Sequence, residues 1–127
     1  MKTSLKLAVG QINPTIGDLN GNIALMLEAA RSARDAQADL VVFPELSLTG
    51  YSPADLLDDE GFAARLQAAA AQLRQASRET PSLHWVVGLP LARQAQGGKR
   101  YVNALQVLLN GEVVHEQHKQ QIRRVGA

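Results

Sequence analysis

The order of apolar and polar positions predicts a strand followed by a helix at the start of the chain. Leu5–Gln11 alternates apolar and polar residues, which is typical of a strand, and Asn13-Pro14 ends it. Asp18 is placed to cap a helix over about Leu19–Gln37. Apolar residues recur on one face of this helix: Ile23, Met26, Leu27, Ala30 and Ala33.

A second strand and a second helix follow. Leu40–Phe43 is a continuous apolar run, which predicts a strand buried on both faces. A helix is predicted over Glu60–Ser77, with Asp58 or Asp59 as its cap and Thr80-Pro81 as its end. Its apolar face consists of Phe62, Leu66, Ala69, Ala70 and Leu73. A strand, a helix and a strand in this order predict a right-handed crossover and a parallel pair.

The last third of the chain predicts extended structure. His84–Leu89 reads as a third buried strand that ends before Pro90, and Gln94–Lys99 as a polar turn. Asn110-Gly111 between two extended runs is the strongest short-range signal for a hairpin. Those runs are Tyr101–Leu109 and Glu112–Gln117. The whole order predicts an α/β fold with a mixed sheet covered by helices.

Composition narrows the classes of function. The 127 residues make one domain at most, and a net charge of +1 gives no electrostatic reason to expect nucleic acid or an anionic membrane as a partner. No apolar stretch approaches the roughly 20 residues of a membrane span, and no signal peptide precedes the first strand, so we expect a cytoplasmic protein. The three histidines lack metal-ligand spacing, and we expect no metal site.

The segment Val41–Leu57 carries the main candidate for chemistry. Its apolar start ends in Pro44, and Glu45 follows at once, before a turn-rich loop. A carboxylate at the end of a buried strand is costly unless it is paired or used. Glu45 could instead cap a loop or pair with an arginine, and position alone does not separate these roles.

Several motifs together resemble the nitrilase-like glutaminase domain of glutamine-dependent NAD synthetase. They are Gly10-Gln11-x-Asn13-Pro14, Gly17-Asp18-x-x-Gly21-Asn22, Phe43-Pro44-Glu45-Leu46, Thr49-Gly50-Tyr51-x-Pro53-x-Asp55-Leu56-Leu57, Val87-Gly88-Leu89-Pro90 and His118-Lys119-Gln120. The resemblance covers Leu7 to about Gln121 and fails at about Arg123, where the family continues with proline, asparagine and tyrosine. It implies that residues 1–127 are the N-terminal portion of a carbon-nitrogen hydrolase domain, an incomplete four-layer αββα sandwich.

The resemblance also implies a catalytic triad of glutamate, lysine and cysteine. Glu45 would be the general base, in a strand-end pocket where burial raises a carboxylate's pKa. Lys119 would stabilise the oxyanion, and Tyr51 would border the glutamine pocket. The nucleophile would be a cysteine, and this sequence has none, so we expect the chain to be inactive alone.

The complete enzyme to which this resemblance points would hydrolyse glutamine to glutamate and ammonia and amidate deamido-NAD. ATP, magnesium and deamido-NAD would belong to its separate synthetase domain, and no Ser-Gly-Gly-x-x-Ser nucleotide loop occurs in this sequence. The resemblance also implies that the complete enzyme is a homo-oligomer. Two alternatives remain: a fragment of another carbon-nitrogen hydrolase, such as an amidase or carbamoylase, and a non-catalytic interaction module.

Overall fold

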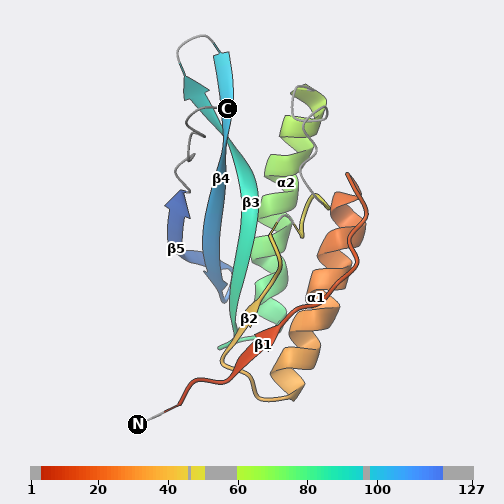
Figure 1. Ribbon diagram of the computed structural model, residues 1–127, viewed down its shortest axis with the longest axis vertical. Helices are drawn as coiled ribbons and strands as arrows, with labels where there is room; N and C mark the ends of the chain where they lie inside the picture. The colour runs from red at the N-terminus through yellow and green to blue at the C-terminus, as the bar shows by residue number, and fades with distance from the viewer. Residues whose placement is uncertain (1–3, 46, 51–59, 96–97, 119–127) are drawn as a thin grey trace, which may run out of the picture.

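The computed structural model describes residues 4–45, 47–50, 60–95 and 98–118 and arranges them as one mixed sheet with helices on one side (Figure 1). The strands lie in the order β1-β2-β3-β4-β5, with β1, β2 and β3 parallel and the β3-β4-β5 part antiparallel. The strands are β1 (Leu7–Val9), β2 (Leu40–Val42), β3 (His84–Ala95), β4 (Gly98–Leu109) and β5 (Glu112–His118). The helices are α1 (Leu19–Asp35), α2 (Glu60–Ala76) and the short 3-10 helix η2 (Ser77–Glu79). The predicted α/β class and mixed sheet are confirmed.

The start and the inner face of α1 follow the sequence pattern. The Asp18 carboxylate accepts a hydrogen bond from the Gly21 amide at 3.1 Å and so satisfies one of the free N–H groups at the helix start. The predicted apolar face is turned to the sheet, with Met26, Ala30 and Ala33 buried. The helix ends at Asp35, two residues before the predicted end, because Gln37 adopts a positive φ of 62°.

The core lies between the two helices and the inner face of the sheet. The predicted inner face of α2 is buried, and Trp85 of β3 is fully buried beneath it. The indole N–H of Trp85 donates to the Thr80 hydroxyl oxygen at 2.9 Å, so this buried polar group is satisfied. Its ring lies against Phe43, with ring centroids 5.6 Å apart. This contact anchors Phe43, the residue that leads from β2 to Pro44 and Glu45.

The predicted caps of α2, Asp58 and Asp59, lie outside the described residues.

The other face of the sheet is uncovered in the described part of the chain. Alternation along the paired strands puts a set of aliphatic side chains there, all exposed or half-buried. They are Leu7, Val9, Leu40, Val42, Val86, Leu105, Val107 and Leu109. The prediction that β2 is buried on both faces is therefore wrong for these residues: Val41 is fully buried against the helices, but its neighbours are half-buried on the open face. The described residues supply one sheet and one helical layer.

β3 continues six residues beyond its predicted end and passes through Pro90. The Val86 carbonyl accepts the Phe43 amide at 3.0 Å, so the even-numbered residues of β3 turn their backbone groups toward β2. Pro90 shares that direction, and β2 has already ended at Val42. The missing N–H therefore costs no bond between β3 and β4. The predicted polar turn is shorter than expected, because Gln94 pairs with Lys99 across the two strands.

The turn between β4 and β5 confirms the predicted hairpin and docks on η2. Asn110 and Gly111 have φ values of 52° and 88°, as a two-residue hairpin turn requires. The Gly111 amide donates to the Ser77 hydroxyl oxygen at 2.8 Å, and the Ser82 amide donates to the Asn110 side-chain oxygen at 3.2 Å. These bonds join the hairpin to the end of the helical layer.

We expect Gly111→Ala to destabilise the chain by roughly 1–2 kcal/mol, because the positive φ of residue 111 is unfavourable for alanine. Its Cβ would also overlap the Arg78 side chain. Gly61→Ala is the matched control, because Gly61 is exposed within α2 and alanine favours a helix. Urea denaturation should give a lower midpoint for Gly111→Ala and an unchanged or higher one for Gly61→Ala. Equal midpoints for Gly111→Ala and the parent chain would contradict the docked turn.

Candidate active site

Glu45 lies directly beyond β2, in a turn whose two sides are fixed. On the entry side, the Phe43 amide bonds to the Val86 carbonyl of β3 and the Phe43 ring contacts Trp85. On the exit side, the Ser47 amide and hydroxyl both donate to the Pro44 carbonyl, at 3.2 and 2.7 Å. The turn therefore closes around Glu45 itself.

The turn directs Glu45 across β3 on the open face of the sheet. A Cβ placed on Gly88 would lie 3.9 Å from the Glu45 Cγ and 3.8 Å from its Cα. Val87 and Leu89 point toward the helices, so the Cβ direction of Gly88 is toward the opposite face. The carboxylate thus lies on the face that the described helices do not cover. The predicted burial of Glu45 is not observed, since Glu45 is exposed in this structure.

The segment after this turn is held by the first loop of the chain. Asn22 of α1 is fully buried, and its side-chain amide bonds to the Thr15 and Leu48 carbonyls. The Gly17 amide donates to the Thr49 carbonyl at 2.9 Å. Asn22 is the last residue of the Gly17-Asp18-x-x-Gly21-Asn22 motif, but its role is not predicted by that motif. The available signal was that Asn22, a polar residue, directly precedes Ile23, the first residue of the predicted apolar face of α1.

β5 is the edge strand opposite β1, and its end lies at the same level along the sheet as Glu45. His118 pairs with Ala104, which pairs with Leu89, the residue after Gly88. Residue 118 is therefore two strand spacings, roughly 10 Å, from the β3 position beside Glu45. Lys119 and Tyr51, the other predicted site residues, lie outside the described residues.

A chain of polar side chains lies at this end of β5. The Gln106 side-chain amide, which is buried, donates to one Glu116 oxygen at 2.6 Å. The other Glu116 oxygen lies 2.9 Å from His118 Nε2. These groups fix the helix-facing side of the last described residues of β5. Within the part of the chain that the structure describes, no three acidic, histidine or cysteine side chains gather as a metal site requires.

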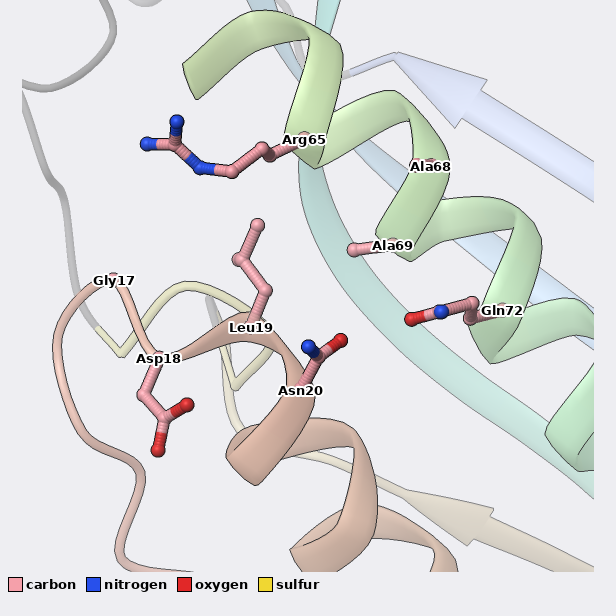
Figure 2. Close-up of a pocket in the computed structure, with 8 residues that line it drawn as sticks. All are labelled: Gly17, Asp18, Leu19, Asn20, Arg65, Ala68, Ala69 and Gln72. Carbon is pink, nitrogen blue, oxygen red and sulfur yellow. The ribbon is translucent and has the colours of Figure 1, made fainter. Parts of the chain in front are cut away.

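A hollow of about 330 Å³ lies on the helical side of the molecule, away from Glu45. Figure 2 shows Leu19 between its walls, with Asp18 and Asn20 at the start of α1 and Arg65 and Gln72 on α2. The Asp18 carboxylate that borders it is the cap of α1. The sheet separates this hollow from the face on which Glu45 lies, so the two are different places in the fold. No helix in the described ranges is long and apolar enough to cross a membrane.

Comparison with known proteins puts this geometry in a family context. A sequence model described as carbon-nitrogen hydrolase matches residues 6–126. The glutamine-dependent NAD(+) synthetase of Acinetobacter baylyi is 37% identical over 111 residues, which are 87% of this chain and 19% of that protein. The chain therefore spans about a fifth of the length of this relative.

Solved structures show the same arrangement of elements. The glutamine-dependent NAD+ synthetase from Acinetobacter baumannii, in complex with ADP, superposes with a TM-score of 0.76 at 30% identity, over 96% of this chain and 22% of that one. A mutant amidase from Nesterenkonia sp. AN1 superposes with a TM-score of 0.75 at 25% identity, over 94% of this chain and 44% of that one. That amidase carries the acetamide moiety of fluoroacetamide on its active-site cysteine.

Proposed function

Because this chain belongs to the carbon-nitrogen hydrolase family, we propose that it is the N-terminal part of the glutaminase unit of a glutamine-dependent NAD synthetase. The observation that carries the proposal is the placement of Glu45. It follows β2 after Phe43 and Pro44 and lies over Gly88, within a segment similar to the NAD synthetases. In this proposal the unit hydrolyses glutamine to glutamate and ammonia.

Glu45 is the general base of the proposed reaction. Its carboxylate takes the proton of a cysteine thiol, and the thiolate sulfur bonds to the side-chain carbonyl carbon of glutamine. The carbon–nitrogen bond then breaks, and Glu45 returns the proton to the leaving ammonia. Glu45 next takes a proton from water, whose oxygen attacks the thioester carbon, and the released thiolate is reprotonated. The cysteine comes from outside these 127 residues, since the sequence has none.

Lys119 stabilises the oxyanion in this proposal, and Tyr51 borders the glutamine. The position of His118 supports the role of Lys119: residue 118 lies roughly 10 Å across the sheet from the β3 position beside Glu45. The parent enzyme, a homo-oligomer, uses the ammonia in a separate ATP-dependent domain. ATP, magnesium and deamido-NAD bind there.

An amidase is the second candidate, because the Nesterenkonia amidase superposes on this chain about as well as the NAD synthetase does. The sequence after Glu45 favours the first candidate. Thr49-Gly50-Tyr51 followed by Pro53 and Asp55-Leu56-Leu57 is more similar to the NAD synthetase branch than to amidases. The two candidates share the proposed base and differ in the amide that they cleave.

A chimera tests the proposal. The matching 111-residue segment of the Acinetobacter baylyi enzyme is replaced by the corresponding segment of this chain, and release of glutamate and ammonia is measured. We expect the chimera to hydrolyse glutamine and to prefer it to acetamide. A soluble chimera that cleaves acetamide and leaves glutamine intact would establish the second candidate instead. The unaltered Acinetobacter enzyme is the control for both substrates.

A further inference from the structure

A single buried side chain links the loop before α1 to the segment after Glu45. Asn22 has no exposed surface, and all three of its side-chain hydrogen bonds go to backbone groups. Its Nδ2 donates to the Leu48 carbonyl at 2.9 Å and to the Thr15 carbonyl at 2.8 Å. Its Oδ1 accepts the Thr15 amide at 2.8 Å. A side-chain amide, with both donors and an acceptor, matches this set of partners.

Two further contacts join the same two segments. The Gly17 amide donates to the Thr49 carbonyl at 2.9 Å. Gly50 has a φ of +102°, and a Cβ there would lie 2.7 Å from the Ile16 Cα, so the two backbones touch. Residues 15–17 and 48–50 therefore pack as one unit around Asn22. We call this unit the Asn22 clamp.

The Asn22 clamp begins one residue after the turn that contains Glu45. The turn is fixed to β3 through Phe43 on one side, and Ser47 closes it by its bonds to the Pro44 carbonyl. Leu48, which comes next, is held by Asn22 and is itself buried in the core. The direction of Glu45 over Gly88 is thus set between two anchors, β3 and α1. Without the second anchor, only the Ser47 bonds and the packing of Leu48 in the core would hold the exit of the turn.

We propose that Asn22 is a positioning residue for Glu45: by bonding to Leu48 and Thr15 it holds the turn that aims the carboxylate across Gly88. The role rests on the proposed function of Glu45 as a base. The side-chain hydrogen bonds of Asn22 go to the Thr15 and Leu48 backbone, so it acts through the backbone of the Asn22 clamp. A base held in one direction transfers protons more efficiently than one that samples several.

Asn22→Asp tests the inference in the full chain, because it keeps the size of the side chain and changes its donors. When protonated, the introduced carboxyl accepts the Thr15 amide and donates to one carbonyl. When ionised, it has no donor for either carbonyl, and burial beside them raises its pKa. The Asp18 carboxylate, which caps the same helix, is present in every variant, so its effect is the same in all of them. Asn20→Asp is the matched control, since Asn20 is exposed two residues earlier in α1.

The readout is the nuclear Overhauser effect between the Glu45 γ-protons and the Gly88 α-protons. We expect it in the parent chain and in Asn20→Asp at about pH 4.5 and about pH 7.5. In Asn22→Asp we expect it at the lower pH and its loss at the higher. Its persistence in Asn22→Asp at the higher pH, with that variant folded, would overturn the inference. So would an equal loss in Asn20→Asp.

Hydrogen exchange in the unmodified chain gives a second test, which does not depend on how the variants fold. If the Asn22 clamp holds the turn, the Thr15, Gly17 and Ser47 amides open together. Their protection factors should then agree within about threefold. A Ser47 amide that exchanges more than about tenfold faster than the Thr15 amide would show that the turn opens independently, and the inference would be wrong.

The chimera separates this inference from the proposed function. Asn22→Asp in the chimera should lower kcat at about pH 7.5, leave KM unchanged and recover toward the parent value as the pH falls. If Glu45→Gln leaves turnover intact, the proposed function fails, while the Overhauser and exchange results still decide the role of Asn22. If Glu45→Gln abolishes turnover and Asn22→Asp matches Asn20→Asp, the function stands and the inference fails.

Discussion

Glu45→Gln in the chimera should lower kcat for glutamine hydrolysis by about 10²–10⁴-fold, the usual contribution of a positioned general base. The replacement keeps the shape of the side chain and its ability to accept a hydrogen bond, but it cannot take a proton at neutral pH. The substrate pocket is unchanged by it, so KM should change little. Initial rates of ammonia release over a range of glutamine concentrations give both constants.

Glu28→Gln is the control for this experiment, because Glu28 is an exposed carboxylate on α1, outside the Glu45 turn. The same change of charge there should leave kcat and KM at the parent values. Turnover by the Glu45→Gln chimera that equals that of the Glu28→Gln chimera would remove Glu45 from the chemistry. The structural description of its turn would be unaffected.

Trp85→Ala should destabilise the chain by about 3–5 kcal/mol, the usual cost of truncating a large buried aromatic side chain. Trp85 has no exposed surface, contacts the Phe43 ring and bonds to Thr80. Domains of this size are stable by roughly 5–15 kcal/mol, so this single change removes a large part of the total. The midpoint of urea denaturation, followed by far-ultraviolet circular dichroism, measures it.

Two further variants show whether this loss comes from packing. Leu25→Ala truncates an apolar side chain that is 36% exposed on α1, and its effect should stay within about 0.5 kcal/mol. Thr80→Val leaves the indole N–H of Trp85 without its acceptor, at a cost of about 1–3 kcal/mol. A Trp85→Ala effect no larger than that of Thr80→Val would mean that the hydrogen bond, and not the ring, carries the stabilisation.

Local chemistry made the helices and the hairpin predictable from sequence. The apolar residues of α1, which follow the cap Asp18, and those of α2 recur with the period of a helix. The predicted inner face of each helix is buried. Asn110-Gly111 identified its turn because few other residue pairs accept positive φ at both positions. The place of Glu45 after the second strand also follows from order along the chain.

Features that depend on neighbouring segments were not predictable in this way. The strand through Pro90 is possible because β2 ends at Val42, and the length of β2 cannot be read from the residues around Pro90. The buried bonds of Asn22 join residues 7 and 26 positions apart, which no local pattern shows. Glu45 is exposed because it lies on the open face of the sheet. The residues before it form an apolar run, which predicted only that Glu45 ends a buried strand.

The unequal lengths of β2 and β3 have a consequence for substitutions at residue 88. Beyond the bond of the Phe43 amide to Val86, the chain leaves its pairing with β3 and crosses over β3 where Gly88 leaves room. A methyl group at residue 88 would just touch Glu45, at 3.8 to 3.9 Å, while a branched side chain would push the carboxylate outward. The size of residue 88 therefore determines how closely the Glu45 carboxylate can approach the surface of the sheet. It also determines where a reacting amide would have to lie.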